Sequence, residues 1–203
     1  MQGKISLKDM SFAYKETHPV FQNFNLEIAP GESVALVGET GTGKTTLVNL
    51  ICRFYEPQQG LIEIDDIDYR KLPLKWIHSN LGYVQQVPHL FQGSVMENIR
   101  YGRLNASDEE VMEAARLVCA DEFIQNLPDT YDYKVGEAGN LLSTGQKQLI
   151  AFARVVLADP ALLILDEATA SIDTETEQLV QEAMHVVLKG RTGIIVAHRL
   201  STI

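Results

Sequence analysis

Hydrophobic residues along this chain follow the period of strands in some stretches and that of helices in others. Residues 4–30 alternate between apolar and polar positions, which predicts an antiparallel layer at one edge of the fold. Unbroken apolar runs at residues 33–37, 162–165 and 193–197 predict strands without a polar face, which belong inside a parallel sheet that is covered on both sides. The other expected strands are residues 61–65 and 81–86, with a turn at residues 57–60.

Helical spacing of apolar residues follows the first of these runs and recurs in the second half of the chain. Three of the expected helices carry the spacing of a capping box, in which a hydroxyl residue precedes Glu or Gln by three positions. The pairs are Ser107 with Glu110, Ser143 with Gln146, and Thr174 with Glu177. We therefore expect helices at residues 47–54, 108–118, 143–157 and 174–188, and a mostly helical region between residues 87 and 150.

Composition limits the classes of function. The 203 residues, 45% of them hydrophobic, can bury a sizeable core. A net charge of −10 argues against a nucleic-acid surface, because phosphate neutralisation needs clustered Lys and Arg. Cys52 and Cys119 lie in helical patterns and are expected to be reduced core residues. The sequence has no run of about 18 apolar residues, so we expect any membrane role to come through a partner or another segment.

The strongest local motif is GETGTGKT at residues 38–45, between an expected strand and an expected helix. Glycines let the backbone curl so that several N–H groups point inward, and the helix N-terminus adds partial positive charge. Lys44 can reach the terminal phosphates of a bound polyphosphate, and Thr45 can ligate Mg²⁺. The pattern and its context predict a phosphate-binding loop.

Polar residues at strand ends supply further candidates. Asp166 and Glu167 follow the run at residues 162–165, and His198 follows the run at 193–197. Ligands collect at the carboxyl ends of parallel strands, so Asp166 is expected to hold Mg²⁺ or its water. Tyr14 ends a strand, where it can stack on a purine base or pack as a partly buried edge residue.

Together these motifs closely resemble the nucleotide-binding domain of ATP-binding cassette (ABC) transporters, over essentially the whole chain. GETGTGKT matches Walker A, LLILDE at residues 162–167 matches Walker B, and LSTGQ at residues 142–146 stands where the family has LSGGQ. The resemblance implies an α/β fold: a P-loop NTPase (RecA-like) core with a mainly parallel sheet, an N-terminal antiparallel β layer and an inserted helical subdomain. It further implies one domain over residues 1–203, with residues 1–86 and 160–203 as the nucleotide-binding core and 87–159 as the helical subdomain.

The family's motifs assign roles to residues of this sequence. Glu167 matches the catalytic glutamate, Gln86 the Q-loop glutamine, and His198 the switch histidine. ATP is expected to contact Tyr14, Gly38, Glu39, Thr40, Gly41, Thr42, Gly43, Lys44, Thr45, Thr46, Ser143, Thr144, Gly145, Gln146 and the D-loop residue Asp173. Mg²⁺ is expected to contact Thr45, Gln86 and Asp166.

Two segments resemble the exporter branch of the family: residues 93–99 and residues 135–139. The resemblance implies an ATPase that drives export, works as a head-to-tail pair, and contacts transmembrane domains through their coupling helices at the cytoplasmic face of the cell membrane. It implies a membrane-spanning part before residue 1 and, since family domains usually continue past the switch histidine, a chain shortened at Ile203. The transported substrate is not encoded here.

Thr144 departs from the family pattern, which has glycine there. Threonine adds a branched side chain near the phosphate and disfavours any left-handed conformation. We therefore expect a weakened signature and a heterodimer with a different chain rather than a homodimer. Two rival functions are a soluble ABC-type ATPase, against which the short helical insertion and the acidic balance argue, and a nucleotide switch without turnover, against which Glu167 argues.

Overall fold

The computed structural model describes residues 1–15, 17–166 and 174–197. The chain forms two compact units. The first contains Met1–Gly82, Pro160–Leu165 and Gly190–Ile203, and the second contains Tyr83–Asp159 and Asp166–Lys189.

The antiparallel layer expected from the alternating N-terminal pattern is present in the first unit. It has the strand order β2-β1-β4-β5. The strands are β1 (Ile5–Lys15), β2 (His18–Ile28), β4 (Gln59–Ile64) and β5 (Ile67–Asp68). Ile5 pairs with Ile28 on one side and with Ile64 on the other, and all three are fully buried. These three isoleucines therefore belong to the buried core on the apolar face of the sheet.

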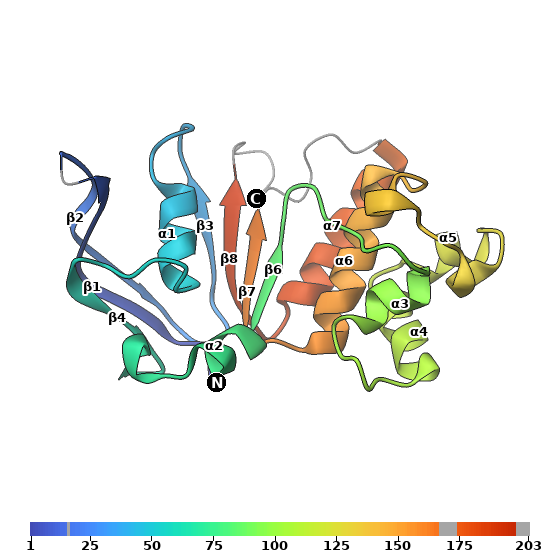
Figure 1. The fold of residues 1–203 in the computed structure, drawn as a ribbon, viewed down its shortest axis with the longest axis horizontal. Coiled ribbons are helices and arrows are strands. Elements are labelled where there is room, and N and C mark those ends of the chain that lie inside the picture. Colours follow the sequence, from blue (N-terminus) through green and yellow to red (C-terminus); the bar gives the residue numbers. More distant parts are fainter. Residues whose placement is uncertain (16, 167–173, 198–203) are drawn as a thin grey trace. The chain divides into compact units, whose positions relative to one another are not determined.

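The unbroken apolar runs form a second sheet in the order β3-β8-β7-β6 (Figure 1). Its strands are β3 (Ser33–Val37), β8 (Thr192–Ala197), β7 (Leu162–Asp166) and β6 (Leu81–Val84). β3 and β8 run parallel, with Ser33 opposite Gly193 and Val37 opposite Ala197. β7 is an internal strand whose first four residues are buried, as its apolar sequence predicted. α1 (Lys44–Ile51), the 3-10 helix η1 (Tyr69–Lys71) and α2 (Leu74–Ser79) belong to the same unit.

The second unit is mostly helical. Its elements are α3 (Val95–Arg100), α4 (Asp108–Leu117), α5 (Asp121–Gln125), η2 (Thr130–Asp132), η3 (Glu137–Gly139), α6 (Thr144–Ala158) and α7 (Thr174–Leu188). The capping boxes expected at Ser107 and Ser143 are both formed, with reciprocal bonds to Glu110 and Gln146. A third box, Ser94 with Glu97, begins α3. Among the described residues, no helix is long and apolar enough to cross a membrane.

Several boundaries differ from the expected ones. The helix expected at residues 47–54 is α1, which begins at Lys44 and ends at Ile51, and Arg53 beyond it has φ 56°. Cys119 was expected in a helix but lies just after α4 at φ 57°, partly exposed. Cys52 is fully buried as expected, and this burial raises the pKa of its thiol to about 12. The spacing of apolar residues therefore predicted the positions of the helices better than it predicted where each helix begins and ends.

Candidate functional site

The loop between β3 and α1 closes around the ammonium group of Lys44. Its Nζ donates to the carbonyl oxygens of Gly38 at 2.5 Å and Glu39 at 2.9 Å. Gly41 and Gly43 have φ angles of +89° and +93°, in the left-handed region that L side chains rarely adopt. The glycines thus give the loop the curl that the motif predicted.

The position of Gly43 also has no room for a side chain. A Cβ at this position would lie 2.9 Å from Cγ1 of Val20 and 3.0 Å from Cζ of Phe21, both on β2. The start of α1 is therefore held closely against the antiparallel sheet. Val20 is a site residue that sequence reasoning missed, because an apolar residue in a strand has no local signal beyond that of a core position.

The N-terminus of α1 is suited to an anion. Gly43 is the N-cap residue and supplies no side-chain cap, and the first turn contains no acidic residue. The first N–H groups of a helix lack intrahelical partners and carry partial positive charge. Lys44 adds a full positive charge at the same point, so phosphate groups are favoured here.

A cavity of about 330 Å³ opens at this helix start. It is lined by Tyr14, Val20, Thr40, Gly41, Gly43, Lys44, Thr45 and Thr46. Tyr14 lies at the end of β1 with 52% of its surface exposed, and its hydroxyl donates to Oγ1 of Thr46 at 3.2 Å. An exposed aromatic ring, a cation and free helix N–H groups therefore meet in one cavity, which matches a base attached to a polyphosphate.

Thr42 stabilises the loop through two hydrogen bonds to Glu39. Its N–H and its hydroxyl both donate to the carbonyl of Glu39, at 3.3 Å and 2.8 Å. Thr45 is exposed within the cavity, whereas Thr46 is buried. The structure thus brings together Tyr14 and all nine residues from Gly38 to Thr46 in the first unit.

The candidate magnesium ligands are divided between the units. Thr45 belongs to the first unit, and Gln86 and Asp166 belong to the second. Asp166 ends β7, is partly exposed and accepts a hydrogen bond from the Tyr83 hydroxyl at 3.4 Å. Hydroxyl, carboxylate and amide oxygens fit Mg²⁺, which uses few protein ligands alongside phosphates and water. Among the described residues, no group of three His, Cys, Asp or Glu forms a dedicated metal cage.

Three expected site residues lie outside the described residues: Glu167, Asp173 and His198. Their assigned roles stay predictions. Glu167 directly follows Asp166 in the sequence, and His198 directly follows the last residue of β8.

The signature segment forms the start of α6. The Ser143 hydroxyl accepts from the N–H of Gln146 at 3.2 Å, and the Gln146 side chain accepts from the N–H of Ser143 at 3.0 Å. This box leaves the N–H groups of Thr144 and Gly145 for other partners. Thr144 is the first helical residue, so its backbone is helical and not left-handed, and threonine is unstrained there. Its branched side chain remains beside the free N–H groups.

The two exporter-like segments lie side by side in the second unit. The N–H of Val135 donates to the carbonyl of Gly93 at 3.0 Å, and Ser94 forms an antiparallel bridge with Lys134. Nζ of Lys134 lies 3.6 Å from the Glu97 carboxylate, and backbone bonding at Ser94 holds the pKa of Glu97 below its usual range. The segments at residues 93–99 and 135–139 therefore lie side by side, and Glu97, Glu137 and Ala138 are their exposed residues.

Arg154 of α6 organises the neighbouring chain. Its guanidinium donates to the carbonyl of Asn98 at 2.6 Å, to the side-chain oxygen of Asn98 at 2.5 Å and to the carbonyl of His89 at 2.8 Å. It also lies 5.5 Å from the ring centre of Phe91. Burial lowers the pKa of Arg154 to about 10. Sequence reasoning missed this residue, since none of its contacts is local.

A cavity of about 270 Å³ opens beside Arg154. Among its lining residues, Phe91 and Tyr101 are 43% and 59% exposed, and their rings lie 4.5 Å apart. Exposed aromatic side chains around a hollow are typical of a protein contact surface.

Comparison with known proteins agrees with this geometry. The family model described as "ABC transporter" matches residues 21–170. The ABC transporter ATP-binding protein YknV of Bacillus subtilis is 52% identical over 203 residues, which are 100% of this chain and 34% of that protein. The ATP-dependent lipid A-core flippase of Legionella pneumophila is 47% identical over 203 residues, again 100% of this chain and 34% of that protein.

A solved structure is also similar. A bacterial Atm1-family ABC exporter with ATP bound matches with a TM-score of 0.90 and 40% identity, covering 100% of this chain and 35% of that one. The expected fold class is therefore confirmed. The chain spans about one third of the length of these curated relatives.

Proposed function

The chain belongs to the ABC transporter family, and we propose that it binds ATP in the cavity at the start of α1 and hydrolyses it to drive export. The observation that carries this proposal is the meeting of Tyr14, Lys44 and the uncapped helix start in one cavity. A base can stack on the Tyr14 ring while the phosphates reach the loop and the ammonium group. The ATP-bound exporter of similar fold supports the choice of nucleotide.

We propose the residue roles in hydrolysis from the family motifs that these residues match. Lys44 leaves the loop carbonyls of Gly38 and Glu39 to donate to the terminal phosphates. Glu167 polarises the attacking water, Gln86 senses the Mg²⁺ and the γ-phosphate, and His198 holds the γ-phosphate. Thr45, Gln86 and Asp166 would hold Mg²⁺, which would neutralise charge on the phosphates.

We propose that two such domains meet head to tail, so that the start of α6 serves the nucleotide of the partner. Its N–H groups at Thr144 and Gly145 are not used by the capping box and suit a γ-phosphate. Because the Thr144 side chain stands beside them, the physiological partner is a different chain with an intact signature. A homodimer that tolerates Thr144 is the alternative.

The joined segments at residues 93–99 and 135–139 are proposed to contact coupling helices of transmembrane domains. The exposed Phe91, Tyr101 and Leu104 in the same unit support a protein contact. This arrangement puts the domain at the cytoplasmic face of the cell membrane. A soluble ABC-type ATPase with a long coiled-coil insertion is disfavoured, since the longest described helices of the second unit have 15 residues.

Titration of the full chain with a fluorescent ATP analogue tests the proposal. Lys44→Ala is expected to abolish binding at physiological nucleotide concentrations, because Lys44 is the one charged side chain among the described residues that line the cavity. Lys75→Ala, at an exposed position of α2, is the matched control and should bind as the parent does. Equal affinities for all three proteins would contradict the proposed site.

A further inference from the structure

The strand that carries Tyr14 extends beyond its neighbour β4. The last pair in the β1·β4 register joins Ser11 to Gln59, the first residue of β4. Gln58 precedes this strand, and its N–H donates to the carbonyl of Ser11 at 3.0 Å. The backbone hydrogen bonding between β1 and the β4 segment thus ends at Ser11, two residues before Ala13.

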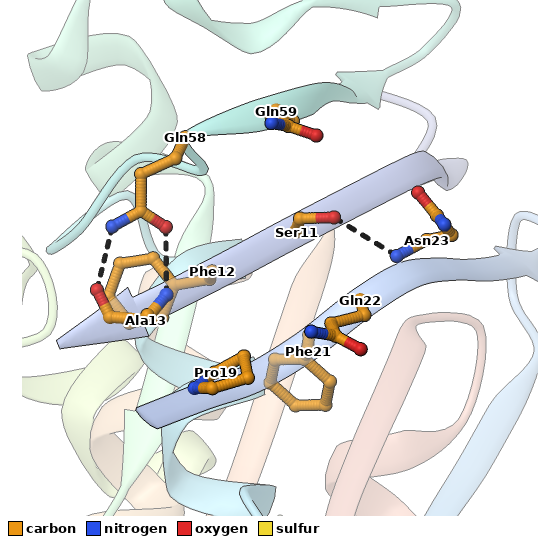
Figure 2. A pocket seen from close by; sticks show the side chains of 9 residues that line it. All are labelled: Ser11, Phe12, Ala13, Pro19, Phe21, Gln22, Asn23, Gln58 and Gln59. Carbon is orange, nitrogen blue, oxygen red and sulfur yellow. Dashed lines mark hydrogen bonds between the residues drawn. The ribbon is translucent and has the colours of Figure 1, made fainter. Parts of the chain in front are cut away.

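The side chain of Gln58 continues that hydrogen bonding (Figure 2). Its Oε1 accepts from the N–H of Ala13 at 2.7 Å, and its Nε2 donates to the carbonyl of Ala13 at 2.7 Å. One carboxamide therefore bonds both main-chain groups of Ala13, as a residue of a neighbouring strand would. This fixes the backbone directly before Tyr14.

A second residue of the same segment fixes the Tyr14 ring. Tyr55 packs edge-to-face on Tyr14 with ring centres 5.2 Å apart. Phe12 also packs edge-to-face on Tyr14, with ring centres 5.0 Å apart. Tyr55 is itself held, since its N–H donates to the carbonyl of Asn49 in α1 at 3.4 Å and its carbonyl accepts from the Tyr69 hydroxyl at 3.3 Å. Edge-to-face pairs restrict the tilt of both rings.

These contacts connect the two ends of the nucleotide cavity. Residues 55–58 follow the C-terminal end of α1, whereas Lys44 and Thr46 lie at its beginning. The Tyr14 hydroxyl donates a hydrogen bond to Thr46 and so links the ring to the beginning of α1. The ring at the base end of the cavity is thereby held relative to the helix that carries the phosphate site.

We propose that Gln58 is a positioning residue for the base of the nucleotide: it holds β1 at Ala13 so that the Tyr14 ring, with Tyr55 against it, presents its face to adenine. The inference rests on the proposed ATP site. Gln58 acts through Tyr14 and not through the phosphates, so its loss affects a ligand that has a base and spares one that has none.

Calorimetric titration of the full chain with ATP and with inorganic tripolyphosphate, both in Mg²⁺, separates these effects. Gln58→Met keeps the length of the side chain and removes both bonds to Ala13. It is expected to raise the Kd for ATP about fivefold, because the two exposed hydrogen bonds to Ala13 are lost. The Kd for tripolyphosphate should stay within about twofold of the parent value. Gln59→Met is the matched control. Gln58 and Gln59 both line a hollow of about 630 Å³ (Figure 2), and the Gln59 variant should change neither Kd.

Gln58→Glu is the second variant. One oxygen of its carboxylate still accepts from the N–H of Ala13, but the other faces the Ala13 carbonyl oxygen in place of a donor, so its Kd for ATP should also rise above that of the parent. Equal weakening of both ligands, no change in either, or the same effect from Gln59→Met would overturn the inference. A parent chain that binds neither ligand would instead contradict the proposed function.

Discussion

Replacing Arg154 by Met should destabilise the second unit strongly. The guanidinium makes three hydrogen bonds to the carbonyls of His89 and Asn98 and to the Asn98 side chain. Hydrogen bonds from a charged donor contribute about 1.5–3 kcal/mol each, but desolvation of the charge, seen in the lowered pKa of Arg154, offsets part of this. We expect a net loss of about 3 kcal/mol, also because the main-chain carbonyl of the buried Asn98 would lose its bond from Arg154.

Thermal unfolding followed by circular dichroism measures this loss. For a chain of this size, about 3 kcal/mol corresponds to a fall in Tm of about 6–12 °C. Arg116→Met is the matched control, since Arg116 is exposed and, within the described part of the chain, forms one ion pair, with the exposed Glu113 at 3.3 Å, a pair worth about 1 kcal/mol or less. Because the pKa of Arg154 is still about 10, the group stays charged and the difference between the variants should be the same at about pH 6 and about pH 8. An Arg154→Met protein that melts with the control would refute the reasoning.

Two further variants test the ends of the nucleotide site. Tyr14→Ala should weaken ATP binding by about 1–2 kcal/mol through lost stacking, whereas Tyr14→Phe loses only the partly buried bond to Thr46 and should stay within about twofold. Titration with a fluorescent ATP analogue measures both, and an unchanged affinity in Tyr14→Ala would leave the ring a packing role. Thr144→Gly should raise the turnover of the chain when it is assayed alone, because it removes the side chain beside the free N–H groups of α6. Brisk turnover by the parent with no gain from Thr144→Gly would contradict the heterodimer.

The sequence predicted those parts of the site whose geometry is local. Gly41, Gly43 and Lys44 lie within one loop, and the strand and helix on either side of it follow from short apolar periods. The capping box at Ser143 was likewise predicted, because its two members are three residues apart. Such features depend on neighbours in the chain, which the sequence displays directly.

Residues whose roles depend on distant partners could not be predicted in this way. Arg154 bonds His89, 65 residues away, and Gln58 bonds Ala13, 45 residues away. Gln58 was expected only as part of a turn, since nothing near it in the sequence indicates a strand end that needs a partner.

Replacement of Glu167 by Gln tests the central claim, ATP hydrolysis at the proposed site, most directly. The change keeps the shape of the side chain and removes a group assigned to the attacking water, so ATP binding by the full chain in its assembly should stay within about twofold of the parent. Steady-state turnover should fall by about 100-fold or more. Hydrolysis by Glu167→Gln at the parent rate, with ATP bound equally well, would contradict the account.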